Sequence, residues 1–382
     1  MDGLEGWRRK IDEIDRELMD LFERRMALVA NVAKYKEENN LPIFQEDREK
    51  LVIEKNLNHI KQEELKKYVE EFLQSLMDVS KEYQREKVLS QNNNKIEITE
   101  VSKSSEKLNK LKIGYGGTEG SFSEEALLKY FGENHNRKSY EEFEGVFIGL
   151  KNGEIDYGVL PIENSSTGAV NDVYDLLRKY GFYIVGEESI SITQHLLGCR
   201  GARIDLIKEV YSHPQGLQQS SNFLKQYSEW KKIPNNNTAI AAKLISETND
   251  CTKAAIASKR AASIYGLDIL KENINNEESN HTRFIIIGKN IENSKEKDRI
   301  SVVFTLENKV GTLFNMLSYI NRNGLNMVKI ESRPVGKEPW KYYFYIDFQG
   351  NIEENSVNNT LALIQKNSSY YRLLGTFKGV SL

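Results

Sequence analysis

Apolar residues in the first part of the chain recur with helical spacing. At about 100° per residue one narrow stripe collects six of them. They are Ile11, Ile14, Leu18, Phe22, Val29 and Val32. The pattern predicts a helix from residue 4 to about 38, since proline first appears at Pro42, and two further helices within 45–60 and 62–87. Three helices make a thin core, so we expect the stripe to be buried by dimerisation.

Cations interrupt this stripe. Arg25 and Lys36 lie near its centre and Arg8 lies at its edge. Such side chains can pass beside an apolar seam with their charges in water. If they are buried they need an anion, and a dianionic ligand between the helices would supply it. The polar residues that would complete this pocket are Arg48, Glu49, Ser80 and Gln84.

The pattern changes after the helices. Residues 88–110 are rich in Asn, Ser, Lys and Glu and indicate a linker. Residues 111–290 alternate between strand and helix patterns, which predicts α/β layers with mainly parallel sheets and ligands at the carboxyl ends of strands. Residues 299–382 follow a βαββαβ order, which is typical of a ferredoxin-like unit. The chain is therefore predicted to be multi-domain: an all-α helical domain at 1–87, an α/β domain and a C-terminal α+β domain.

The composition of the chain excludes several classes of function. The 382 residues carry a net charge of −3, so no basic field favours nucleic acid. Two cysteines are too few for a disulfide framework, and no apolar run reaches the ~20 residues of a membrane span, so we expect a cytoplasmic protein. The five histidines show no metal-ligand spacing, and the glycines of 114–120 do not fit a dinucleotide fingerprint. We expect no cofactor and no metal.

Three polar segments of the α/β region carry candidate chemistry. The loop within "LPIENSSTGAV" (160–170) offers N–H groups and hydroxyls to an anion, or serves only as a helix cap. His213 in "SHPQ" is either structural or catalytic. Arg283, which follows Thr282 at the entry to a strand, is either an edge charge or a carboxylate anchor.

The spacing "WRRKIDEID…ERR…AKYK…EDRE…S…Q" resembles the helical chorismate mutases fused in bacterial P-proteins, over nearly all of residues 1–87. The resemblance implies that three arginines hold the substrate carboxylates, one of them supplied by the other subunit: Arg8, Arg25 and Arg48. It implies that Lys36 and Gln84 bind the ether oxygen and that Glu49 and Ser80 hold the hydroxyl. Gln45 departs from the family, in which an acidic residue is common. A pericyclic rearrangement needs a compact substrate and a stabilised ether oxygen, which fixed cations provide.

The stretches "GTEGSFSEEA", "LPIENSSTGAV", "SHPQ" and "TRF" together resemble prephenate dehydratase over about 111–289. The resemblance implies two α/β lobes around a cleft, similar to periplasmic-type binding folds, with Thr282 as the catalytic residue. It places Arg283 near the substrate and lines the cleft with Asn164, Ser165, Ser212 and Gln215. Gly216 and Ser220 depart from the common pattern without changing the chemistry. Prephenate loses carbon dioxide and its ring hydroxyl, and we treat the Thr282 hydroxyl as an oriented donor to that leaving group.

Residues 310–334, "VGTLFNMLSYINRNGLNMVKIESRP", resemble the ACT regulatory domains of phenylalanine-sensitive dehydratases. The resemblance implies an L-phenylalanine site at a domain interface, although Thr312 replaces the usual alanine. Its residues would be Gly311, Thr312, Leu313, Glu331, Ser332 and Arg333. The alternative is a ferredoxin-like fold used only for dimerisation.

These resemblances predict a bifunctional, phenylalanine-inhibited enzyme of L-phenylalanine biosynthesis that acts on chorismate and prephenate as a homodimer or homotetramer. Two alternatives stay open. The two-lobed domain could be a sensor that only binds a small acid, or the helical region could be a dimerisation module without activity.

Overall fold

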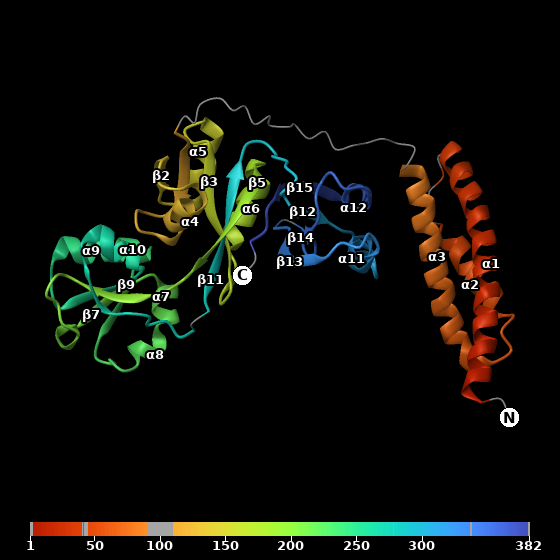
Figure 1. The fold of residues 1–382 in the computed structure, drawn as a ribbon, viewed down its shortest axis with the longest axis horizontal. Coiled ribbons are helices and arrows are strands. Elements are labelled where there is room, and N and C mark those ends of the chain that lie inside the picture. The colour runs from red at the N-terminus through yellow and green to blue at the C-terminus, as the bar shows by residue number, and fades with distance from the viewer. Residues whose placement is uncertain are drawn as a thin grey trace. The chain divides into compact units, whose positions relative to one another are not determined.

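The computed structural model describes residues 3–39, 41, 45–89, 110–277, 279–336 and 338–380. The chain divides into two compact units, within residues 1–96 and 97–382 (Figure 1). Most of the predicted linker, from residue 90 to 109, lies outside the described residues, as does Pro42. No helix in the described ranges is long and apolar enough to cross a membrane.

The first unit is a helical bundle, as predicted. Its helices are α1 (Leu4–Glu38), α2 (Glu46–Leu57) and α3 (Lys66–Leu89), with a short 3-10 turn at Glu63–Leu65. Helix α3 packs against both α1 and α2. The α1 stripe is exposed in the single chain, where Ile11 and Ile14 are 55% and 57% exposed, and its burial by dimerisation stays a prediction. Two shorter helices are too few to cover a 35-residue helix along its length.

The second unit begins with one α/β lobe. A mixed sheet carries helices α4 (Phe122–Phe131), α5 (Phe143–Asn152) and α6 (Asn171–Tyr180). Its strands are β1 (Lys112–Gly116), β2 (Asn136–Tyr140), β3 (Tyr157–Asn164), β5 (Tyr183–Ser191) and β11 (His281–Gly288), with the short β4 (Gly168–Ala169) beside β3. The prediction of mainly parallel sheets is wrong here. Strand β11 runs antiparallel to both β3 and β5, because it returns the chain from the second lobe.

The second lobe is inserted between β5 and β11. Its sheet has the order β10-β6-β9-β7-β8, in which β7 is parallel to β8 and β9 while β6 is antiparallel to β9 and β10. The strands are β6 (His195–Gly198), β7 (Glu209–Ser212), β8 (Lys231–Pro234), β9 (Lys253–Ala257) and β10 (Asp268–Lys271). The helices are α7 (Pro214–Gln219), α8 (Ser221–Leu224), α9 (Thr238–Thr248) and α10 (Lys259–Tyr265), with a 3-10 turn at Ile204–Leu206.

The C-terminal part confirms the βαββαβ order. It comprises β12 (Arg299–Thr305), α11 (Thr312–Arg322), β13 (Met327–Pro334), β14 (Tyr342–Gln349), α12 (Asn355–Lys366) and β15 (Tyr370–Phe377). The strand order β13-β14-β12-β15 is that of a ferredoxin-like sheet. Strand β15 also pairs in parallel with β5, through Gly375 and Ile184, so this sheet continues into that of the first lobe.

Candidate functional site

A cavity of about 490 Å³ lies between the two lobes of the second unit. Helices α4 and α9 begin at it, and their N-caps Ser121 and Asn237 are among its lining residues. Their first-turn N–H groups and helix dipoles favour negative charge at this wall. Among the described residues of the lining, Glu141 is the only charged carboxylate and no Lys or Arg is present.

Thr282 and Asn164 form the polar centre of the cavity wall. They are paired across β11 and β3, and both line the cavity. The Asn164 side-chain Nδ2 donates to the Thr282 Oγ1 at 2.8 Å and to the Asn280 Oδ1 at 2.8 Å. Because the Thr282 hydroxyl accepts this bond, its own hydrogen remains free to donate into the cavity. Thr282 is only 8% exposed, so such a donor works in a poorly hydrated place.

The other end of the Asn164 amide fixes the loop that follows β3. Its Oδ1 accepts from the backbone N–H groups of Ser166 and Thr167, at 3.0 and 3.1 Å. Thr167 in turn accepts a 2.8 Å bond from Gln215 Nε2, which joins the two lobes across the cavity. Gln215, predicted to line the cleft, therefore does so and also bridges it.

His213 lies at the mouth of α7, in the lining of the cavity. Its Nδ1 accepts from the Gln215 backbone N–H at 3.2 Å, so the ring caps this helix. Burial lowers the pKa of His213, which keeps the imidazole neutral near pH 7.

Two predicted cleft residues, Ser212 and Ser165, do not line the cavity. Ser212 is fully buried and donates to the Ile256 carbonyl at 2.7 Å, because it ends a central strand of the second lobe. Ser165 accepts from the His281 N–H at 3.0 Å and so ties its loop to the start of β11.

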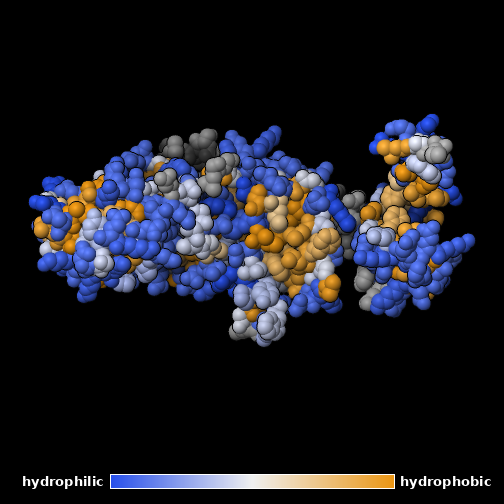
Figure 2. All heavy atoms as spheres, turned by 90° about the horizontal axis from the view of Figure 1, so that it is seen from below, coloured by the Kyte–Doolittle hydropathy of each residue, from blue (hydrophilic) through white to orange (hydrophobic). Residues whose placement is uncertain are grey.

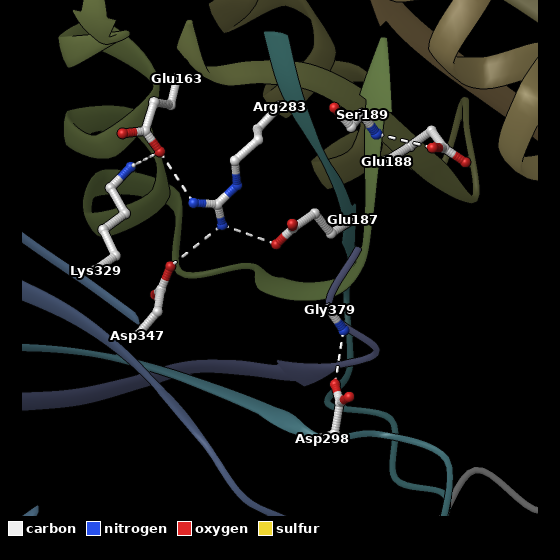
Figure 3. Close-up of polar contacts among 9 residues, drawn as sticks. All are labelled: Glu163, Glu187, Glu188, Ser189, Arg283, Asp298, Lys329, Asp347 and Gly379. Atoms are coloured by element: carbon white, nitrogen blue, oxygen red, sulfur yellow. Dashed lines mark hydrogen bonds and ion pairs between the residues drawn. The ribbon is translucent and has the colours of Figure 1, made fainter. Parts of the chain in front are cut away.

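Arg283 also departs from its predicted place. Successive residues of a strand face opposite sides of the sheet, so Arg283 points away from the cavity that Thr282 faces. Its guanidinium binds Glu163 Oε2 at 3.0 Å and Glu187 Oε2 at 2.8 Å, and lies 3.5 Å from the Asp347 carboxylate of β14 (Figure 3). It is therefore a structural cation at the C-terminal domain rather than an anchor for a cavity ligand.

Three residues that help to build the cavity site were not predicted from the sequence. Asn280 is buried and holds Asn164, and Gln194 is buried with no partner for its Oε1 among the described residues. Asn237 caps α9 at the cavity. Asn280 directly precedes "HTRF" and Asn237 precedes a helical run, which are the signals that would have found them.

A second polar cluster lies inside the helical unit. Arg25 of α1 donates to the Ser80 hydroxyl of α3, and Ser80 is buried. Burial lowers the pKa of Arg25. Gln84, one turn beyond Ser80, is also buried and its Oε1 has no partner among the described residues.

Lys36 and Glu49 extend this cluster. Burial lowers the pKa of Lys36, and the nearby Glu49 carboxylate opposes that shift. Glu49 itself is bound by Lys81 at 3.0 Å. The structure thus brings together the side chains of three helices around a half-buried set of cations.

Arg8 and Arg48 are less enclosed than the other predicted mutase residues. Arg8 pairs with Glu5 at 3.2 Å on the exposed first turns of α1. Arg48 is exposed in α2, one residue before Glu49.

The predicted effector residues lie on two elements of the C-terminal domain. Gly311 has φ +81° at the start of α11, and Thr312 Oγ1 donates to the Glu307 and Lys309 carbonyls at 3.0 Å. Leu313 is half-buried. On β13, Ser332 is exposed, Glu331 is half-buried and Arg333 binds Asp175 of α6 at 2.9 Å.

Fold and sites together define a class of protein: a helical bundle with enclosed cations, joined to a two-lobed α/β ligand-binding domain. Residues 7–85 match the family model described as chorismate mutase type II, and residues 113–292 match prephenate dehydratase. The chain is 34% identical over 379 residues to the bifunctional chorismate mutase/prephenate dehydratase of Buchnera aphidicola subsp. Acyrthosiphon pisum, covering 97% of this chain and 95% of that protein. The protein belongs to the family of bifunctional chorismate mutase/prephenate dehydratases.

Two further comparisons agree. The bifunctional enzyme of Escherichia coli (strain K12) is 30% identical over 376 residues, which is 97% of this chain and 95% of that protein. The prephenate dehydratase of Arthrobacter aurescens, whose crystal structure was solved in complex with L-Phe, has a TM-score of 0.65 and 26% identity. It covers 71% of this chain and 92% of its own.

Proposed function

We propose that the protein converts chorismate to prephenate in its helical domain and prephenate to phenylpyruvate in its two-lobed domain. The observation that carries the dehydratase assignment is the Thr282 hydroxyl, which is held by Asn164 at 2.8 Å on the wall of the interlobe cavity. The family of the chain supports both activities.

In the dehydratase step, prephenate loses carbon dioxide and water, and aromatisation drives the reaction. The departing hydroxide needs a hydrogen-bond donor, which Thr282 supplies because its oxygen is already occupied as an acceptor. With no Lys or Arg in the described lining, the substrate carboxylates are held by the N–H groups at the starts of α4 and α9. Gln215 closes the cavity by joining the lobes.

In the mutase step, chorismate rearranges without a nucleophile or a base. Arg25 is oriented by Ser80 and holds a substrate carboxylate. Lys36 and Gln84 stabilise the ether oxygen as its bond to carbon breaks, while Glu49 and Ser80 hold the hydroxyl. Arg48 at the edge of the same unit binds a carboxylate, and the exposed Arg8 serves the partner subunit.

The C-terminal domain is an ACT domain that binds L-phenylalanine, the end product, through the residues of 311–313 and 331–333. The L-Phe complex of the Arthrobacter aurescens dehydratase supports this assignment. Inhibition requires that L-phenylalanine bind one conformational state more tightly than the other.

The protein acts in the cytoplasm as a homodimer or homotetramer. Half-exposed apolar residues on α1 support self-association. Figure 2 shows a second apolar surface over the C-terminal domain. The exposed apolar residues of this domain include Phe314, Val328 and Ile330.

To test the proposal, the purified protein is given chorismate as its only substrate. The loss of chorismate and the formation of phenylpyruvate are both measured. Phenylpyruvate from chorismate is the expected result, because the dehydratase substrate must first be made by the mutase. If prephenate accumulates without phenylpyruvate, the two-lobed domain is a sensor that only binds a small acid. Unchanged chorismate would reduce the helical domain to a dimerisation module.

The variant Arg25→Ala separates the two activities. We expect mutase turnover to fall by about 10²–10³-fold, the usual cost of one charge-stabilising group, while dehydration of added prephenate is unchanged. Arg24→Ala is the matched control, since Arg24 is exposed on the same turn of α1. Equal mutase rates in the two variants would contradict the assignment of Arg25.

A further inference from the structure

A cluster of five charged side chains joins the catalytic strands to the C-terminal domain. Arg283 and Lys329 share the Glu163 carboxylate at 3.0 and 2.9 Å, and Arg283 also faces Glu187 and Asp347 (Figure 3). The side chains of Lys329 and Glu187 are only 7% and 2% exposed. Charges this enclosed interact strongly, since little water screens them.

The cluster is one residue away from the dehydratase centre on both of its strands. In the β3–β11 ladder, Thr282 pairs with Asn164 and the next rung pairs Arg283 with Glu163. The first rung faces the cavity and the second faces the C-terminal domain. The register shifts directly after Arg283, so regular pairing does not by itself fix this end of the ladder. The ion pairs of the second rung therefore help to fix the position of the first.

The C-terminal residues of the cluster come from strands β13 and β14. Lys329, Glu331 and Arg333 alternate with exposed residues of β13 and so share its inward face. Lys329 binds Glu163, and Arg333 binds Asp175 on α6. The strand proposed to bind the effector is thus also the strand that contacts the first lobe.

Resting on the proposed function, we propose that Lys329 and Asp347 are positioning residues for the dehydratase. They hold the Arg283–Glu163 rung, and through it the Thr282 hydroxyl and its Asn164 partner. A shift of β13 and β14 when L-phenylalanine binds loosens this rung and lowers the rate of dehydration.

The protonation of the cluster agrees with tight pairing. Burial alone would raise the pKa of Glu163, but hydrogen bonds from Lys329 and Arg283 bring that pKa below its usual value. Burial lowers the pKa of Arg283, and Glu187 and Asp347 more than offset this effect. Removing one ion-pair partner leaves an enclosed charge without a counter-ion, which is unfavourable. The Arg283–Glu163 rung is then expected to shift.

The test compares Lys329→Met, Lys329→Arg and Asp347→Asn in the full-length protein, with prephenate as substrate and added L-phenylalanine. For Lys329→Met and Asp347→Asn we expect kcat to fall about tenfold or more, the cost of slight misplacement of a reacting group, with KM unchanged. Inhibition by L-phenylalanine weakens in both. Lys329→Arg restores the charge and rescues kcat.

Lys341→Met is the matched control, because Lys341 has an ion pair with Glu338 in the same domain but none with the first lobe among the described residues. Asp347→Asn changes no volume and keeps the test open if Lys329→Met fails to fold. If Lys329→Met and Asp347→Asn both keep the wild-type kcat and the wild-type inhibition by L-phenylalanine, the inference is overturned. A rise in KM without a fall in kcat also overturns it. A wild-type protein that makes no phenylpyruvate overturns the proposed function itself.

The two cysteines of the chain are in contact within the second lobe. Cys199 directly follows β6 and Cys251 precedes β9, 52 residues later, yet their Sγ atoms are 2.7 Å apart. A disulfide bond measures about 2.0 Å, so only a small approach is needed to form one. The pair lies where β9 begins, whereas the cavity lies beyond the end of β7, the parallel neighbour of β9, and beyond the end of β8, which runs parallel to β7.

We infer that Cys199 and Cys251 form a reversible disulfide when a small-molecule disulfide such as glutathione disulfide is the oxidant. The half-exposed Cys251 thiolate attacks glutathione disulfide, forming a mixed disulfide and releasing one glutathione thiolate. Cys199 then gives its proton to the released glutathione thiolate, attacks the Cys251 sulfur and expels the second glutathione as a thiolate. Burial raises the pKa of Cys199 to about 11, which makes it the second nucleophile rather than the first.

Intact-protein mass spectrometry tests this inference on the protein treated with glutathione disulfide. The expected product has lost two hydrogens and carries no glutathione, and dithiothreitol restores the original mass. Its thermal midpoint rises relative to the reduced protein, whereas kcat for prephenate is unchanged. Cys199→Ser should instead retain one glutathione on Cys251. A stable glutathione adduct on the wild-type protein, or two free thiols after treatment, overturns the inference.

Discussion

Thr282 and Arg283 show how one residue step separates two tasks. Both belong to β11, but the side chains face opposite sides of the sheet. Thr282 meets the interlobe cavity, and Arg283 meets the carboxylates beneath the C-terminal domain. The Thr282 hydroxyl, which we propose acts on the substrate, and the ion pairs of Arg283 therefore lie on adjacent rungs and on opposite faces of the sheet.

The hydroxyl of Thr282 is the most specific target for substitution. Thr282→Val keeps the shape and removes the donor, so we expect the rate of phenylpyruvate formation to fall by about 10²–10⁴-fold, the usual contribution of a positioned proton donor. Thr282→Ser should retain most of the rate. The assay uses added prephenate, and mutase turnover of the same preparations is the control. A Val variant as active as the Ser variant would remove Thr282 from the reaction.

Glu163 predicts a pH dependence of stability. Its pKa in the folded protein is below its usual 4.5, so its contribution to stability is complete above pH 4.5 and is lost as the pH falls through the folded value. The stability difference between wild type and Glu163→Gln should therefore be largest near neutral pH and shrink at about pH 3. Urea unfolding at both pH values measures it. A difference that grows in acid would contradict the ion pairs described for Glu163.

At the scale of elements, the junction between two sheets depends on a single glycine. Gly375 of β15 pairs with Ile184 of β5, and a Cβ at position 375 would meet the Ile184 backbone. No side chain fits between two paired strands at this distance. This close approach makes one continuous sheet from two domains that the sequence pattern separates.

Gly375→Ala should consequently destabilise the second unit by about 1–3 kcal/mol, the usual cost of overpacking. Gly336→Ala is the control, because a Cβ there has nothing within 4 Å. Chemical denaturation followed by tryptophan fluorescence would measure both. Equal stabilities would show that the two sheets do not depend on this contact.

The elements themselves were largely predictable. Helix α1 ends within a residue of its predicted boundary, and the βαββαβ order was correct, because both follow from local periodicity. Strand β11 was predicted as a strand, but its antiparallel direction was not. Direction depends on where the chain re-enters a sheet, and residues 192–280 between the two crossings make up the second lobe.

At the scale of the whole molecule, the α1 stripe predicts assembly. Ile14 is 57% exposed in the single chain, beside Ile11 and Leu18 at 55% and 43%. We expect Ile14→Asp to lower the mass of the assembly in light scattering and to reduce mutase activity, because the arginine proposed to come from the partner would be lost. Leu206→Asp, at a residue 48% exposed in the second lobe, is the control. An unchanged assembly in Ile14→Asp would place the contact elsewhere.

The sequence by itself determined the helices, the strands and the residue types that chemistry requires, because these depend on periodicity and on motifs of adjacent residues. The resemblance predicted a cleft that includes Thr282, Asn164 and Gln215, and the structure brings these three residues to one cavity. Only the tertiary structure decided that Arg283 faces away, that Ser212 is fully buried, and that Cys199 contacts Cys251. These outcomes depend on which strands pair and which face they present, and pairing joins residues far apart in the chain through burial and charge that no short stretch of sequence contains.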